Sequence, residues 1–369
     1  MKKLLLASAV AALSITAAQA APTVYGKAFL TLDLNDGDTD YTNVVTTTET
    51  TAKGTSTEPT VTVNGSRSEE GRSKLNSNDS RIGVKGSEAL TQNTDLVYQL
   101  EYGVDVDAND NGKDQFYSRD TYLGLSNKQY GTLVAGRLTA IDDYVNYANV
   151  TAGGVLGGDN VLASFDGPRA NNTFAYFSPE RNGLQLMGMY TLDENDDSDS
   201  LGRDAFGVGA KYEPANAAYK VGATYIQAGD FKAARLSGAY AVSPVLTLGG
   251  LYQNADYDSD DNENAFTVSA NYKVAQTPWT AYGQLDFVDN VEGAKDAEKQ
   301  RIAIGGKYAF NKATTGHIYG AYMKTEGILD EATSVTTTTN NQTVRTVDTK
   351  NTKNEFDGFG IGGGIEYKF

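Results

Sequence analysis

Residues 359–369 read Phe359-Gly360-Ile361-Gly362-Gly363-Gly364-Ile365-Glu366-Tyr367-Lys368-Phe369. Bulky apolar side chains fall on one face of this stretch, and most of its glycines, with Glu366 and Lys368, fall on the other. A period of two is typical of a β-strand whose two faces meet different environments. Glycine and charged side chains cannot fill a protein core, but they can line water. The stretch therefore predicts a strand with an apolar outer face and a wet inner face.

The same alternation recurs along the chain in segments of about ten residues that are separated by turns or polar loops. It is clear at 96–102, 219–225 and 302–310. Apolar-out, polar-in strands are the pattern of a membrane barrel, and closure leaves no unpaired backbone edge in the bilayer. We therefore predict an all-β fold, a transmembrane antiparallel β-barrel of about sixteen strands. A barrel of about this size leaves an aqueous channel.

The first twenty residues have the organisation of a secretory signal. Lys2 and Lys3 precede an apolar stretch at 4–15, and small residues near position 20 supply a cleavage site. We expect 1–20 to be removed and 21–369 to form the barrel as one domain. Loss of the two lysines moves the net charge from −16 to −18. This acidic balance argues against nucleic acid as a partner, since phosphate backbones select basic surfaces.

The connections alternate between short turns and long loops, as expected when the two rims of an outer-membrane barrel differ. Short turns are expected near 88–93, 127–130, 180–183, 213–217, 243–244, 274–277 and 311–314. Long loops are expected near 36–72, 107–113, 139–169, 193–204, 256–263, 289–298 and 327–354. The Thr-rich runs at 46–51 and 336–339 lie in two of these loops, and we interpret them as mobile external segments.

The loop from Thr139 to Arg169 is too long for a hairpin turn. A loop of this length in a compact β protein is usually functional or disordered. It contains two glycine pairs, at 153–154 and 157–158, and four carboxylates: Asp142, Asp143, Asp159 and Asp166. We expect this segment, about 139–170, to fold into the barrel lumen and to set the width and charge of a pore.

Four arginines lie on or beside strands that are close to this loop in chain order: Arg81, Arg119, Arg137 and Arg169. Arg81 alternates with Ile82, and the spacing puts Arg137 opposite Val134. An arginine on the lipid face near the bilayer midplane costs about 2–4 kcal/mol, whereas in a water-filled lumen it costs little. We therefore expect these arginines to face the lumen. Simple surface or rim charges are the alternative.

The residue types give little support to catalysis or to a bound metal. His317 is the only histidine, and no serine is tied to it by sequence, so a Ser/His hydrolase is not expected. Residues 107–114 match the first half of an EF-hand loop, but Ser118 stands where the closing glutamate belongs. We expect no enzyme activity, no cofactor and no metal site beyond divalent cations held loosely by acidic external loops, including Asp36, Asp38 and Asp40.

Segment 80–88 reads Ser80-Arg81-Ile82-Gly83-Val84-Lys85-Gly86-Ser87-Glu88. It resembles the Ser-Arg-Leu-Gly-Phe-Lys-Gly stretch of the Gram-negative general diffusion porins. Further stretches resemble that family in the same order, and together they cover essentially the whole chain after residue 20. These stretches are 24–27, 99–101, 118–125, 130–137, 169–179 and Phe369.

This resemblance implies a trimeric sixteen-stranded porin of the outer membrane whose third loop folds inside. It implies contacts with outer-membrane lipid and lipopolysaccharide, and it implies that Phe369 is read by the barrel-assembly machinery. It also implies a basic ladder facing the loop, with Arg81, Arg119 and Arg169 in the ladder and Arg137 and Lys27 nearby. The family often has a Pro-Glu-Phe-Gly-Gly-Asp run in this loop. Residues 154–159 lack its glutamate, so only Asp159 matches.

We predict passive diffusion of small hydrophilic solutes and ions through a water-filled pore. Pore width and the field between the arginines and the loop carboxylates would select the solutes. The alternatives are a substrate-specific sugar channel, which needs a row of luminal aromatics, and a non-conducting adhesin or receptor barrel. The sign of ion selectivity stays open, because acidic loops favour cations at the mouth and arginines favour anions at the narrow point.

Overall fold

The computed structural model describes residues 21–51, 54–57, 61–107, 115–192, 204–259, 261–327, 334–340 and 343–369. The predicted signal segment, 1–20, lies outside the described residues. None of the described helices is long and apolar enough to cross a membrane. The described strands are β1 (Thr23–Thr51), β2 (Gly54–Thr57), β3 (Val61–Ser77), β4 (Arg81–Ala89), β5 (Thr94–Val104), β6 (Phe116–Asn127), β7 (Gly131–Thr139), β8 (Arg169–Phe177), β9 (Leu184–Thr191) and β10 (Ala205–Tyr212). They continue with β11 (Tyr219–Ala228), β12 (Phe231–Ala241), β13 (Leu246–Asp256), β14 (Glu263–Lys273), β15 (Trp279–Asp289), β16 (Glu298–Ala309), β17 (Thr314–Glu326), β18 (Ser334–Asn340) and β19 (Thr343–Lys368). Two short 3-10 helices, η1 (Ile141–Val145) and η2 (Val291–Gly293), lie in connections.

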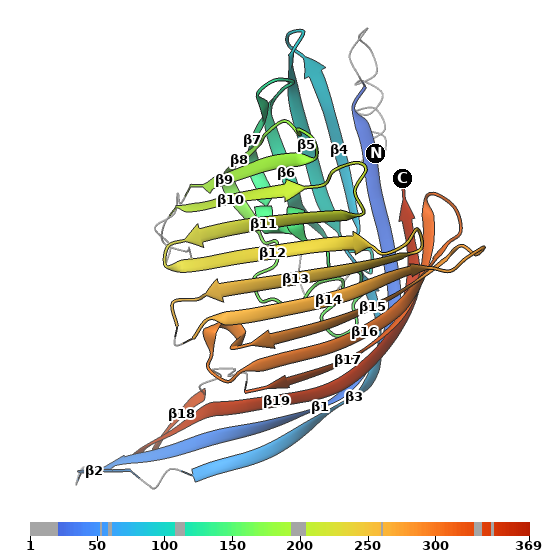
Figure 1. The fold of residues 1–369 in the computed structure, drawn as a ribbon. Coiled ribbons are helices and arrows are strands. Elements are labelled where there is room, and N and C mark those ends of the chain that lie inside the picture. Colours follow the sequence, from blue (N-terminus) through green and yellow to red (C-terminus); the bar gives the residue numbers. More distant parts are fainter. Residues whose placement is uncertain are drawn as a thin grey trace, which may run out of the picture.

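The strands pair antiparallel in chain order, and β19 closes the sheet by pairing with both β17 and β1 (Figure 1). β3 and β4 pair with successive parts of β1, so they act as one wall strand. β2 pairs only with β1, and β18 pairs only with β19. The described strands therefore form a closed sixteen-stranded barrel, as predicted. All seven predicted short turns fall between consecutive strands.

Exposure alternates along the wall strands as the sequence predicts. On β12, Leu236 is 54% exposed, whereas Arg235 and Ser237 on either side are each 2% exposed. On β16, Ile302 is exposed and Arg301 is buried. In a closed barrel the exposed apolar face is the outer one, where it can meet lipid, and the polar face is the inner one.

Two segments that the sequence analysis took for loops are strands. β1 contains the Thr-rich run 46–51, and β18 contains 336–339. β1 has 29 residues, or about 95 Å at 3.3 Å per residue, whereas about 10 residues suffice to cross a bilayer. With β3 and β19 it forms an arm that projects well past one rim (Figure 1). Loops were the wrong prediction because β-branched threonine favours strands even where both faces are polar.

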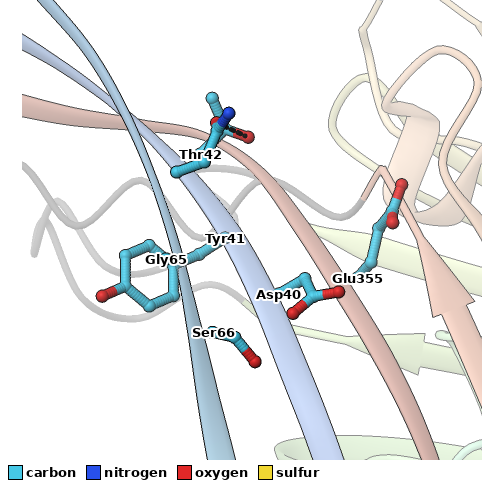
Figure 2. Close-up of a pocket in the computed structure, with 7 residues that line it drawn as sticks. Asp40, Tyr41, Thr42, Gly65, Ser66 and Glu355 are labelled. Atoms are coloured by element: carbon cyan, nitrogen blue, oxygen red, sulfur yellow. Dashed lines mark hydrogen bonds between the residues drawn. The ribbon is translucent and has the colours of Figure 1, made fainter.

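The arm carries a shallow polar hollow of about 460 Å³ (Figure 2). Tyr41 packs over Gly65, its cross-strand partner, where a Cβ would lie 2.4 Å from the ring. Thr42 donates a hydrogen bond of 3.1 Å to the Asn64 side chain. The hollow is lined by Asp40, Tyr41, Thr42, Asn64, Gly65, Ser66 and Glu355. None of these lining residues is positively charged. The arginines that the sequence analysis selected lie on or beside the strands of the barrel wall instead.

Candidate functional site

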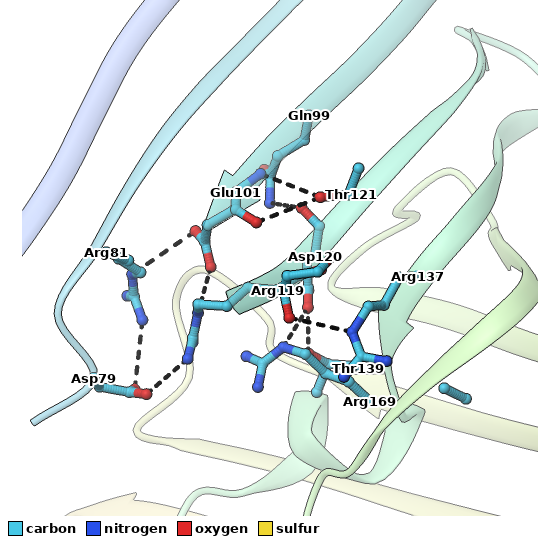
Figure 3. A network of polar contacts seen from close by, with 12 residues as sticks. Asp79, Arg81, Gln99, Glu101, Arg119, Asp120, Thr121, Arg137, Thr139 and Arg169 are labelled. Carbon is cyan, nitrogen blue, oxygen red and sulfur yellow. Dashed lines mark hydrogen bonds and ion pairs between the residues drawn. The ribbon is translucent and has the colours of Figure 1, made fainter. Parts of the chain in front are cut away.

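Three cations and two carboxylates meet on the inner face of β1, β4, β5 and β6. Figure 3 shows the two arginines and the two carboxylates of this group. Arg119 is buried, and it donates to Glu101 and to Asp79, each at 2.7 Å. Arg81 lies 3.5 Å from Asp79 and 3.8 Å from Glu101, and the Lys27 ammonium lies 3.8 Å from Asp79. We call Lys27, Arg81, Arg119, Asp79 and Glu101 the basic cluster. It has one more cation than carboxylates.

Two local irregularities aim the carboxylates of this cluster. Asp79 lies in the bend between β3 and β4 and has a left-handed backbone, with φ of 54°. Glu101 lies where the register of β5 against β6 shifts, which is the mark of a β-bulge. Bulges re-aim a side chain and are common near functional sites. The Tyr25 hydroxyl donates to Glu101 at 2.9 Å and holds it in place.

Arg169 forms a second pair beside the cluster. Its Nε donates to Asp120 at 2.8 Å, and the Thr139 hydroxyl donates to the same carboxylate oxygen at 2.7 Å (Figure 3). Thr139 is the last residue of β7, and Arg169 is the first of β8. Asp120 therefore ties together the two ends of the connecting loop, residues 140–168.

Arg137 does not join the basic cluster. It donates to the Asn171 side chain at 2.6 Å and to the Ser118 carbonyl at 3.2 Å, and no carboxylate of the described residues lies within 4.0 Å of it. The expectation that Val134 lies on the outer face was wrong. Val134 is buried in an inner apolar cluster, whereas Leu133 is half exposed. A register shift just before Leu138 also breaks the alternation on which the prediction for Arg137 depended.

Loop 140–168 packs against the buried faces of the strands from β9 to β17. Helix η1 contacts β9, β10, β11 and β12, and apolar loop side chains fill three clusters against the wall. Its backbone N–H groups donate to wall side chains: Tyr147 to Ser237 (3.0 Å), Val150 to Gln284 (2.9 Å) and Ser164 to Glu263 (2.9 Å). The loop is therefore fixed to the wall by polar as well as apolar contacts.

Two buried arginines hold the loop most directly. Arg235 on β12 lies 2.8 Å from Asp166 and 3.3 Å from Asp142, both loop carboxylates. Arg301 on β16 pairs with Asp286 of β15 at 2.9 Å. Arg301 also donates to three loop carbonyl groups, those of Leu156 (3.1 Å), Gly158 (3.2 Å) and Asn160.

Sequence reasoning did not single out these two arginines. The available signal was alternation, because each arginine comes directly before an exposed apolar residue: Arg235 before Leu236, and Arg301 before Ile302. Alternation gives the face of a side chain but not the loop that it meets.

The four predicted loop carboxylates divide into two groups. Asp142 and Asp166 are held by Arg235, and burial raises the pKa of both, that of Asp166 to about 6. Asp143 and Asp159 are exposed. Desolvation raises their pKa values as well, although Arg235 and Arg169 oppose the shift for Asp143, and Lys307 and Lys27 oppose it for Asp159. Asp143 and Asp159 are thus the loop carboxylates in electrostatic range of the basic side.

The remaining predicted residues lie outside this constellation. His317 on β17 packs against Phe29 with ring centroids 4.7 Å apart, and neither ring nitrogen has a partner among the described residues. Phe369 exchanges two backbone hydrogen bonds with Gly26, which extends the closure between β19 and β1. Most of the EF-hand-like stretch, 108–114, lies outside the described residues. The described residues of the chain contain no cluster of three or more His, Cys, Asp or Glu side chains suited to a metal ion.

Comparison with known proteins adds independent findings. The family described as Gram-negative porin matches residues 6–328. An outer membrane porin protein of Bordetella pertussis is 24% identical and covers 70% of this chain and 80% of its own length. A major outer membrane protein of Pasteurella multocida is 26% identical, covering 92% and 97%. Among solved structures, an anion-selective porin from Comamonas acidovorans has a TM-score of 0.61 at 20% identity, covering 94% of this chain and 99% of its own. OmpT of Vibrio cholerae in its trimer form has a TM-score of 0.58 at 16% identity, covering 94% and 99%.

Proposed function

Because this chain belongs to the Gram-negative porin family, we propose that its basic cluster and loop 140–168 form the constriction of its channel. The protein is an outer-membrane porin, a water-filled barrel for passive diffusion of small hydrophilic solutes and ions. The constriction residues are our assignment. They are Lys27, Arg81, Arg119 and Arg169 on the wall and Asp143 and Asp159 on the loop.

The attachment of the loop to one wall carries this proposal. Arg235 and Arg301 hold the loop against β12 and β16. By strand count β12 lies across the barrel from β4, which carries Arg81, and both β12 and β16 lie six wall strands from β6, which carries Arg119. Solute would then pass between fixed cations and the loop. Width excludes large solutes, and the transverse field orients small charged ones.

We further propose that the chain assembles as a homotrimer in contact with outer-membrane lipid and lipopolysaccharide. The trimer form of the Vibrio cholerae relative supports this state. We propose that Phe369 is read by the barrel-assembly machinery, and that divalent cations associate weakly with Asp36, Asp38 and Asp40 on the arm. We propose no catalytic role for His317.

Planar-bilayer recording tests the channel directly. Purified protein should insert and give stable current steps that rise with KCl concentration. Insertion without steps would instead favour a non-conducting receptor barrel. A current that saturates and is blocked by one sugar would favour a substrate-specific channel.

Acidification should shift the ion selectivity toward anions. The pKa of Asp166 is raised to about 6 by burial, so its carboxyl is ionised at pH 7 and mostly protonated at pH 5. Protonation removes one negative charge from the loop and frees Arg235 from one of its two carboxylate partners. The reversal potential in a KCl gradient should therefore move toward the chloride value between pH 7 and pH 5.

Asp166→Asn is the matched variant for this titration. It lacks the titrating group, so its selectivity at pH 7 should already resemble that of the wild type at pH 5, and its step near pH 6 should be absent. A wild-type step that persists unchanged in Asp166→Asn would assign the titration to another group.

A further inference from the structure

Asp33 on β1 is a buried carboxylate that is not paired with a cation. It is 0% exposed, and no cation of the described residues lies within 4.0 Å of its side chain. Three donors compensate its charge: the hydroxyl groups of Thr31 (2.7 Å) and Tyr319 (2.6 Å) and the side-chain amide of Asn76 (2.5 Å). A buried charge is tolerated only when it is paired or hydrogen-bonded. The carboxylate therefore holds each of these donors in place.

Tyr319 on β17 reaches this carboxylate across the strand that closes the barrel. β19 lies between β17 and β1, and its Gly362 is paired with Tyr319 on one side and with Asp33 on the other. A Cβ at Gly362 would overlap a carboxylate oxygen of Asp33, so only glycine leaves room for the direct bond. The Tyr319 ring thereby takes a fixed position on the inner face of the wall.

Residues 149–159 form a compact unit in the middle of the loop, and we call them the loop tip. The Asn149 side-chain amide donates to the backbone carbonyl of Asp159 at 3.0 Å. The Thr151 hydroxyl donates to the carbonyl of Gly158 at 3.2 Å. A contact that fixes one part of the loop tip therefore also fixes Asp159, its exposed carboxylate.

The loop tip rests on Tyr319 and Asp33 through two glycines. Gly153 has a left-handed backbone, with φ of 83°, and a Cβ there would overlap the Tyr319 hydroxyl. A Cβ at Gly154 would lie 3.2 Å from the Asp33 carboxylate, and the Gly154 backbone N–H faces the Tyr319 hydroxyl. The glycines thus let the backbone of the loop approach the wall closely.

We propose that Asp33 and Tyr319 are positioning residues that hold the loop tip against the wall and so set the width of the passage beside Asp159. This inference rests on the proposed constriction and adds residues that act on it from behind the loop. Arg301 holds only the part of the loop that follows the glycines, through the carbonyl groups of Leu156, Gly158 and Asn160. Asp33 also shares the inner face of β1 with Lys27, so this anchor ties the loop tip to a strand of the basic cluster.

Tyr319→Phe tests the anchor by removing one hydroxyl group. The variant loses the donor to Asp33, so the loop tip should fluctuate more. In planar bilayers the open-channel current noise should rise at least about twofold, because local motion grows where fixed contacts are lost. Tyr282→Phe is the matched control. Tyr282 packs in the same cluster as the loop, but its hydroxyl has no hydrogen-bond partner among the described residues, so the noise should stay at the wild-type level.

Asp33→Ala removes the acceptor of the same hydrogen bond and should also raise the noise. The double variant Asp33→Ala, Tyr319→Phe should be no noisier than Asp33→Ala, since both substitutions break one shared bond. Noise that adds up across the two substitutions would contradict that shared contact. Barrel folding of each variant is checked by heat-modifiable electrophoretic mobility.

A disulfide distinguishes a loose loop tip from a disturbed barrel. The chain has no cysteine, so Val155→Cys with Gly360→Cys introduces a single pair. A Cβ at Gly360 would lie 2.6 Å from a methyl carbon of Val155, which suits a disulfide. In the Tyr319→Phe background the oxidised pair should return the noise to the wild-type level, and reduction should bring it back. Noise that oxidation does not change would place its cause outside the loop tip.

A nitroxide label on Asp159→Cys follows the loop tip independently of the channel. In detergent the spectrum of the label should show greater mobility in the Tyr319→Phe background than with Tyr319 present. Equal mobility in both backgrounds would overturn the anchor and leave the channel standing. Greater mobility with unchanged current noise in Tyr319→Phe would overturn the proposed constriction and leave the anchor standing.

Discussion

Arg301→Met is expected to destabilise the barrel by about 3–5 kcal/mol, because it leaves a buried carboxylate without its cation. Asp286 is 1% exposed and pairs with Arg301 at 2.9 Å. The substitution also removes the donors to the loop carbonyls of Leu156, Gly158 and Asn160. The measurements are the midpoint of the heat-modifiable mobility shift, which should fall, and the open-channel current noise, which should rise as the loop moves.

The double variant Arg301→Met with Asp286→Asn separates the two roles of the arginine. Asparagine removes the stranded charge and can keep the hydrogen bond from Thr267, which is 2.7 Å from Asp286. Stability should recover in large part, while the current noise should persist because the loop has still lost its donors. Recovery of both properties would show that the charge pair matters and that the contacts to the loop do not. Wild-type stability in Arg301→Met would contradict the buried pair altogether.

The wall of the barrel could be predicted from sequence because its signals are local. Alternation over a few residues decides which face of a strand meets lipid, and short turns mark where the strands reverse. Alternation set Arg81 opposite Ile82 in this way, and Ile82 is exposed. The order of strands followed from antiparallel neighbours that are consecutive in the chain.

The attachment of the loop could not be predicted, because it depends on partners far apart in sequence. Gln284 accepts from Val150 across 134 positions, and Arg301 reaches Leu156 across 145. Nothing in a single sequence pairs such residues. The same limit explains why Asp142 and Asp166 were expected near the arginine ladder, whereas the structure binds them to Arg235 on another wall.

Irregular strands set a second limit, since a one-residue shift moves a side chain to the other face. The shift at Glu101 turns a strand residue into a partner of Arg119. The shift just before Leu138 breaks the alternation from which Arg137 was expected to face the lumen. Bulges depend on the partner strand as well as on the bulged one, so a period of two alone does not reveal them.

Arg119→Gln is expected to shift the ion selectivity toward cations by about fourfold. A positive charge about 5 Å from a passing cation in water repels the cation by about 0.8 kcal/mol. The loss of this repulsion corresponds to a factor of about 4 in the cation-to-anion permeability ratio. Arg119 is the most buried arginine of the basic cluster and makes its two shortest pairs. Its removal therefore also leaves Glu101 and Asp79 to add negative charge to the passage. The measurement is the reversal potential in a tenfold KCl gradient.

Arg81→Gln is the matched variant, because it removes the same charge at a more accessible position. The Arg81 side chain is 29% exposed, and its pairs are longer, at 3.5 and 3.8 Å. Its selectivity should shift in the same direction with a smaller loss of stability, because Asp79 and Glu101 keep their shorter pairs with Arg119. If both variants keep the wild-type reversal potential, the basic cluster does not face the ion path. If only Arg119→Gln shifts and its barrel is also less stable, the shift comes from a disturbed wall and not from the lost charge.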